Sequence, residues 1–133
     1  MIEEAYVSFE TAKLLKEKGF EGHSILTIYD ENAANAYIKE LQEKHLPYSS
    51  DDPKLKEFYY TKPTLQMAMR WLREEKGIAA VPILVSVLNN KKFLWDIGIT
   101  VAKTNETYHQ GWVYESYERA CETAIKYCLK NII

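Results

Sequence analysis

Four segments of the chain repeat apolar residues at the three- and four-residue spacing of an amphipathic helix. Most of them also carry local start or stop signals. Ser8 and Ser116 suit helix N-caps, and Gly19 and Gly77 suit the left-handed residue after a helix end. Pro63 is expected as the first residue of its helix, where its missing N–H costs nothing. The predicted helices cover 9–18, a segment around 34–41 that begins at Asp30 or Asn32, 63–76 and 117–133.

Three other segments are rich in β-branched and aromatic residues and predict strands, at 24–29, 79–88 and 93–102. The last two are separated by Asn89-Asn90-Lys91-Lys92 and form a β-hairpin. Pairing Val87 with Phe93 gathers the hairpin's larger apolar residues on one face, whereas a one-residue slip divides them between the two faces. That shared face is predicted to contain Val81, Ile83, Val85, Val87, Phe93, Trp95, Ile97, Ile99 and Val101.

Together these elements predict a single α+β domain over residues 1–133. A small antiparallel or mixed sheet, made of the hairpin and strand 24–29, has about four helices packed on it. The helix around 34–41 has a narrow apolar stripe and is expected to face the core. Residues 45–62 form the one long connector, in which Asp52-Pro53 starts a single helical turn.

The helix at 63–76 is apolar over an unusually wide arc. Its main stripe consists of Leu65, Ala68, Met69 and Leu72, and Met67 and Trp71 form an adjoining shoulder. We favour a second layer of the same chain as the cover of this shoulder, because buried helices have wide stripes. The alternative is a partner surface, since methionine and tryptophan both suit adaptable apolar contacts.

Aromatic residues also gather in the connectors rather than in the periodic elements. They either fold back over the ends of the sheet or contribute to an interface, where amphipathic aromatics are enriched. The hypothesis of a partner interface, whether for another protein or for a second copy in a homodimer, therefore names Met67, Trp71, Phe58, Tyr59, Tyr60 and Trp112.

The charge balance argues against a dedicated nucleic-acid binder. The chain has 17 basic and 19 acidic residues, a formal net charge of −2, with the signs interspersed. A nucleic-acid-binding function is nevertheless the alternative hypothesis, with phosphate contacts from the basic side of helix 63–76 by Lys62, Arg70, Arg73 and Lys76. Such binding weakens steeply with added salt.

No pattern of catalytic or cofactor-binding residues stands out, so we expect neither an enzyme nor a cofactor. The histidines and cysteines lack metal-ligand spacing, and no glycine-rich phosphate loop occurs. If catalysis occurs, Asp96 and His109 are the candidate residues. Cys121 and Cys128 lie seven residues apart on one helix, about 10 Å, which exceeds disulfide reach. With no apolar leader or membrane-length segment, a cytoplasmic protein without membrane contact is expected.

Three segments resemble small uncharacterised proteins encoded by phages and mobile elements of gut anaerobic bacteria. They are YVSFETAKLLKEKGF, PTLQMAMRWLREEKGI and YESYERACETAIKYCLKNII. The resemblance implies a small accessory protein of such an element and carries over no site residues. Combined with the wide helix and the connector aromatics, it gives the leading hypothesis of a non-catalytic interaction protein.

Overall fold

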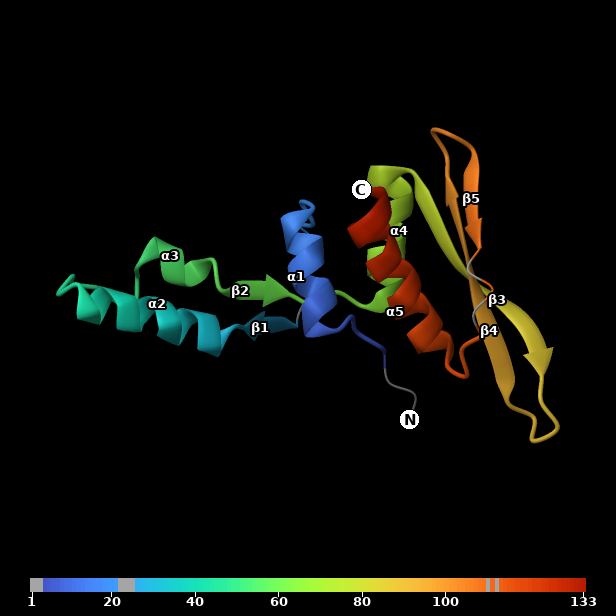
Figure 1. Cartoon of the computed structure of the whole chain (residues 1–133), viewed down its shortest axis with the longest axis horizontal. Helices are drawn as coiled ribbons and strands as arrows, with labels where there is room; N and C mark the ends of the chain where they lie inside the picture. Colours follow the sequence, from blue (N-terminus) through green and yellow to red (C-terminus); the bar gives the residue numbers. More distant parts are fainter. Residues whose placement is uncertain (1–3, 22–25, 110, 112) are drawn as a thin grey trace.

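The structure is a computed structural model that describes residues 4–21, 26–109, 111 and 113–133. The molecule is elongated (Figure 1). A three-stranded sheet lies at one end and a slender arm extends from the other, with helices between them. These helices are α1 (Phe9–Glu17), α4 (Leu65–Lys76) and α5 (Tyr117–Tyr127), and a short π-helical turn, Cys128–Ile132, continues α5.

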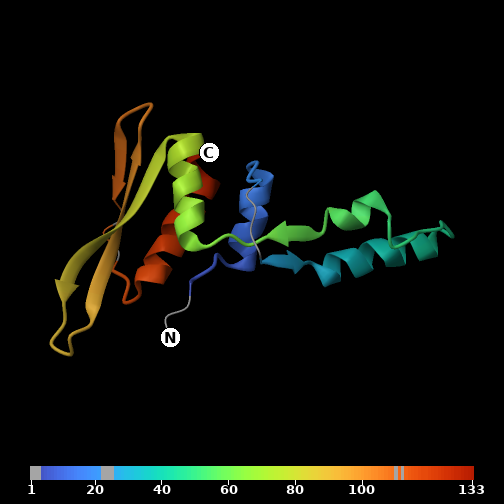
Figure 2. The same ribbon diagram turned by 180° about the vertical axis from the view of Figure 1, so that it is seen from behind.

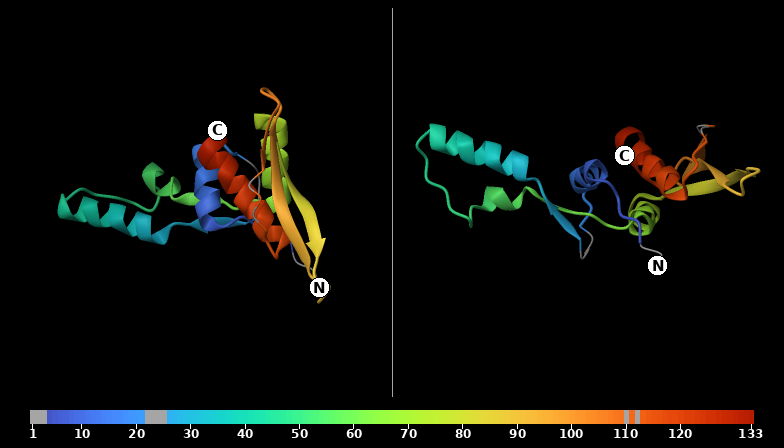
Figure 3. Two further views of the ribbon diagram at one scale, coloured as in Figure 1. Left: turned by 45° about the vertical axis from the view of Figure 1, so that its right-hand side comes forward. Right: turned by 90° about the horizontal axis from the view of Figure 1, so that it is seen from below.

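The α+β class is confirmed. Strands β3 (Ile78–Val87), β4 (Phe93–Val101) and β5 (Glu106–His109) form an antiparallel sheet in the order β3-β4-β5. The predicted hairpin strands match β3 and β4 to within one residue at each end. Strand β5 lies outside the strands predicted from the sequence. Helices α4 and α5 lie on one face of this sheet, as the two views in Figure 3 show.

The prediction of one sheet containing strand 24–29 was wrong. Among the described residues, β1 (Thr27–Tyr29) pairs with β2 (Tyr59–Thr61) in a separate two-stranded antiparallel sheet. The backbone N–H of Lys62 donates to the carbonyl of Leu26 and that of Asp30 to the carbonyl of Phe58, which extends the pairing at both ends. These two strands form the base of the arm (Figure 2).

The helix predicted to face the core lies in the arm instead. Helix α2 (Glu31–Glu43) packs against the segment after it, which includes the short helix α3 (Pro53–Lys56). The Tyr37 hydroxyl donates to Asp52 over 2.8 Å, and its ring lies 6.1 Å from that of Phe58. The apolar stripe of α2 therefore stabilises the arm. The helical turn expected at Asp52-Pro53 is confirmed as α3.

The hairpin register is correct at the turn and shifts further along. Val87 pairs with Phe93 as predicted, but a β-bulge between Leu84 and Ser86 displaces the rest of β3 by one residue. A bulge places one extra residue, here Val85, on one strand only. Consequently Ile78, Ala80, Pro82, Leu84 and Val87 share the face of Trp95 and Ile97, whereas Val81 and Ile83 lie on the opposite face.

Helix ends follow the capping signals with one correction. The side chains of Ser8, Asp30 and Ser116 accept backbone N–H bonds as N-caps, and Gly77 ends α4 with a φ of 65°. Pro63 is not the first residue of α4, because the hydroxyl of Thr64 caps the helix and Pro63 lies before it. A hydroxyl that satisfies the Met67 N–H competes effectively with proline as the start signal.

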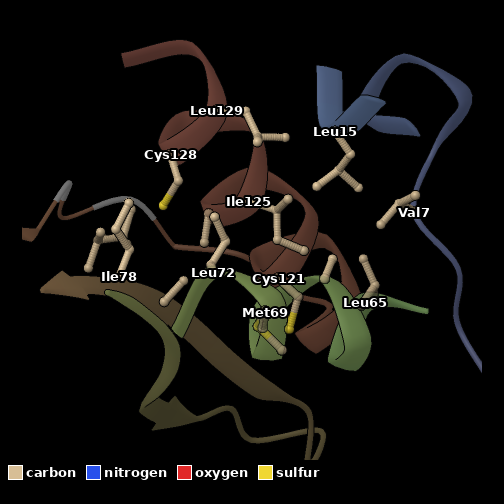
Figure 4. Close-up of a cluster of buried hydrophobic side chains, with 14 of the residues drawn as sticks. Val7, Leu15, Leu65, Met69, Leu72, Ile78, Cys121, Ile125, Cys128 and Leu129 are labelled. Atoms are coloured by element: carbon tan, nitrogen blue, oxygen red, sulfur yellow. The ribbon is translucent and has the colours of Figure 1, made fainter. Parts of the chain in front are cut away.

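The hydrophobic core lies between α1, α4, α5 and the proximal part of the sheet. Figure 4 shows side chains from all three helices and from β3 converging there. Leu15, Leu72, Ile97 and Ile125 are completely buried, and the thiols of Cys121 and Cys128 also lie in this layer. Both cysteines are free thiols, as their spacing predicts.

Helix α5 is also attached to α1 by polar contacts. Glu122 accepts bonds from the Ser8 N–H over 3.0 Å and from the buried Thr11 hydroxyl over 2.5 Å. The ammonium groups of Lys126 and Lys130 contact Glu10 at 2.9 and 3.1 Å. Glu122 and Lys126 therefore both contact α1 or its N-cap.

Candidate protein interaction surface

The shoulder predicted on α4 is half covered. The Trp71 ring contacts the Phe20 ring edge-on at 5.5 Å and lies 5.4 Å below the Lys76 ammonium group. Met67 remains 41% exposed. Trp71 is thus partly in the core layer, and Met67 alone presents an apolar surface there.

The connector aromatics mostly pack within the arm and against α1. Phe58 contacts Tyr37, and Tyr60 contacts the Phe9 ring edge-on at 5.5 Å. Tyr59 is half-exposed and lies 4.5 Å from the Tyr29 ring. Trp112 falls outside the described residues. A partner interface formed by the six predicted residues stays a prediction.

The basic residues of the nucleic-acid hypothesis are spread along α4 and the segment before it. Arg70 pairs with Glu74 at 3.0 Å, and Lys76 lies over Trp71. Arg73 is exposed beside Ile78 and Thr100 at a shallow hollow, and Lys62 is half-buried near β1. The Arg70 and Lys76 side chains thus have contacts within the protein, and phosphate binding by the group stays a prediction.

The candidate catalytic residues lie on neighbouring strands of the sheet. The backbone of His109 on β5 pairs with that of Gly98, two residues after Asp96 on β4. Asp96 is buried, and its carboxylate accepts the Ile97 N–H over 2.7 Å. The side chain of His109 is outside the described part of the structure. Within that part, no three metal-ligating side chains cluster.

The most apolar exposed surface lies elsewhere, on the distal half of the β3–β4 hairpin. There, seven large apolar residues are 36–55% exposed. We call them the distal hairpin surface: Val81, Ile83, Leu84, Val85, Val87, Leu88 and Phe93. Divided between the two faces of the hairpin, they present on the order of 600 Å² of accessible surface, of which each face holds only a part.

The hairpin overhangs because its strands are longer than the helices that cover it. A ten-residue strand spans about 33 Å, whereas the twelve residues of α4 and the eleven of α5 span about 18 and 16 Å. Figure 1 shows the hairpin extending past the beginning of α5. The predicted strand at 79–88 would span about 33 Å, against about 21 and 25 Å for the predicted helices at 63–76 and 117–133, so comparing these lengths would already have indicated an uncovered part of the hairpin.

The two ends of this overhang carry opposite charges. The turn, which we call the tip, carries the exposed Lys91 and Lys92, and no acidic residue occurs between Ile78 and Trp95. At the other end the Trp95 ring contacts the Tyr117 ring at 5.1 Å, which places the start of α5 against β4. Three exposed carboxylates surround this start, together with the cation of Arg119. We call them the acidic wall: Glu4, Glu115 and Glu118.

Neither cysteine has the properties of a nucleophile. Burial raises the pKa of the Cys121 thiol to about 11 and that of the Cys128 thiol to about 12. Both thiols are therefore neutral at physiological pH, and thiolate is the reactive form.

No protein-family model, curated protein or solved structure matches this chain. No described helix is long and apolar enough to cross a membrane.

Proposed function

We propose that this protein is a non-catalytic interaction protein whose contacts run through the distal hairpin surface. The observation that carries the proposal is the concentration of half-exposed Val, Ile, Leu and Phe side chains on one overhanging hairpin. Apolar surface of this extent is costly to leave in water and marks association sites on folded proteins. An accessory role in a phage or mobile element, suggested by the sequence resemblance, belongs to the same proposal.

The hairpin supports this function better than the surfaces expected from the sequence. Trp71 and Tyr60 have aromatic partners within the chain, whereas the distal residues extend beyond the helices that cover the rest of the sheet. The flanking tip and acidic wall add charged groups around an apolar centre, which is the usual arrangement of a protein interface.

Site-specific photo-crosslinking in the native host tests the proposal. A benzophenone amino acid replaces Val87 in one variant and Glu75, which is exposed at the end of α4, in the control. We expect a discrete protein adduct, heavier than the 15.5 kDa chain, from position 87 alone. Equal labelling from both positions, or no protein adduct from position 87, would contradict the proposed function.

A further inference from the structure

We infer that a second copy of this chain, related by a two-fold axis, covers one face of the distal hairpin surface. This inference rests on the proposed function and names its partner. The face involved is the one that also covers the core, which we call the inner face. Its uncovered part contains Leu84, Val87 and Phe93, each at least half-exposed.

The inner face and the start of α5 form an L. The apolar strands are one limb, and the acidic wall, fixed by the contact between Trp95 and Tyr117, is the other. Lys92 lies three residues before Trp95, about 10 Å along an extended strand. Two such shapes fit together when one is turned by a two-fold rotation, since each tip then lies at the other copy's wall.

The charges favour this self-association over an unrelated apolar partner. Lys91 and Lys92 have no carboxylate partner among the described residues. Glu4 and Glu118 line the same surface hollow, so two like charges are close together there. A two-fold contact is self-complementary by symmetry and brings the tip of each copy to the acidic groups of the other. Arg119 reduces the charge of the wall without reversing it.

The β3 edge of the sheet favours a dimer contact through side chains over one in which a strand of the second copy pairs with β3. Strand β3 is an edge strand, but Pro82 lacks an N–H and the bulge at Val85 interrupts its regular backbone. Both features are ways in which edge strands avoid pairing with other chains. The two copies therefore pack inner face to inner face.

The area is that of a modest but specific dimer. Apolar side chains, tips and walls of two copies together bury on the order of 1,000 Å², the lower range for biological interfaces. We expect a dissociation constant in the micromolar range, because an interface of this size has to offset the entropy of association.

Sedimentation velocity over a series of micromolar concentrations tests the inference first. The wild type should convert from monomer to dimer as concentration rises. Val87→Asp on the inner face should remain monomeric, while the matched control Val81→Asp, on the outer face and 51% exposed against 55%, should dimerise like the wild type. Circular dichroism checks that both variants are folded.

A charge-exchange experiment tests the two-fold arrangement. One variant combines Lys91→Glu with Lys92→Glu, and the other combines Glu115→Lys with Glu118→Lys. Each alone opposes like charges, so its dimer Kd should rise by about 10-fold or more. An equimolar mixture restores opposite charges at both contacts and should form heterodimers at the wild-type concentration.

Several results would overturn the inference: a monomeric wild type at every concentration, loss of dimers in Val81→Asp but not in Val87→Asp, or no heterodimer in the mixture. A monomeric chain that still crosslinks another protein from position 87 would refute the dimer and leave the proposed function intact. Failure of both experiments would refute both.

Discussion

The two halves of the β3–β4 hairpin have similar composition and opposite environments. In the proximal half, Ile78, Ala80, Ile97 and Ile99 are at most 3% exposed beneath α4 and α5. In the distal half, Leu84, Val87 and Phe93 are at least half-exposed on the same face. Hydrophobicity alone therefore does not separate core from interface here. Coverage by the helices separates the two halves, and we propose that another molecule covers the apolar side chains of the distal half.

The largest expected difference is in stability, and matched isoleucines measure it. Ile97→Ala removes a completely buried side chain and should lower the free energy of unfolding by about 2–5 kcal/mol. Ile83→Ala removes the same atoms from a 41% exposed position and should cost about 1 kcal/mol or less. Urea denaturation measures the free energy of unfolding of both variants, at protein concentrations too low for dimerisation. Equal losses would show that the distal half is as much a part of the core as the proximal half.

The next effect concerns the polar attachment that holds α5 over the proximal half. Glu122→Ala leaves the Ser8 N–H and the buried Thr11 hydroxyl without their acceptor, which should cost about 1–3 kcal/mol. Glu75→Ala, on an exposed turn of α4, should change stability by about 0.5 kcal/mol or less. The same urea measurement compares them. If Glu122→Ala lowered the free energy of unfolding no more than Glu75→Ala, the bonds of Glu122 to Ser8 and Thr11 would not contribute to stability.

A smaller effect should be visible at alkaline pH. Burial raises the pKa of Cys121 and Cys128 from 9.0 to about 11 and 12, so the folded state binds these protons more tightly than the unfolded chain. The stabilisation is complete below about pH 9 and is lost as the pH rises towards the folded-state pKa values. Between about pH 8 and 11 the wild type should therefore lose more stability than a Cys121→Ala, Cys128→Ala variant. If the urea midpoints of the wild type and the variant decreased equally with pH, burial of the thiols would be contradicted.

The smallest effect is expected at Glu10 on α1. Hydrogen bonds and charge attraction from Lys126 and Lys130 lower the pKa of this carboxyl below 4.5. Its stabilising contribution is present above that value and decreases as the pH falls through the lowered pKa. Because the group is exposed, Glu10→Gln should lower the melting temperature slightly at low salt and hardly at all at high salt. A large, salt-independent loss would indicate a different role for Glu10.

Local signals in the sequence predicted the helices well. The caps at Ser8, Asp30 and Ser116, the glycine after α4 and the pairing of Val87 with Phe93 each depend on a few neighbouring residues. Strands β2 and β5 were missed because three or four residues are too few for alternation to be visible.

Long-range features were harder to predict. The bulge at Val85 has no signature in a uniformly apolar strand, so the faces of Val81 and Ile83 were assigned wrongly. The narrow stripe of α2 predicts burial but does not identify the surface that buries it, which turned out to be the arm. The candidate site was not predicted for a related reason: the wide apolar arc of α4 is visible within one element, whereas the overhang of β3 depends on comparing the lengths of several elements.

Amide hydrogen exchange at two protein concentrations tests the central claim most directly, that another molecule covers the distal half. With rising concentration, exchange should slow at Leu84, Val87 and Phe93, while Ile97 and Ile99 should keep the same protection. Distal amides whose exchange does not depend on concentration, or proximal amides that change equally, would contradict the claim.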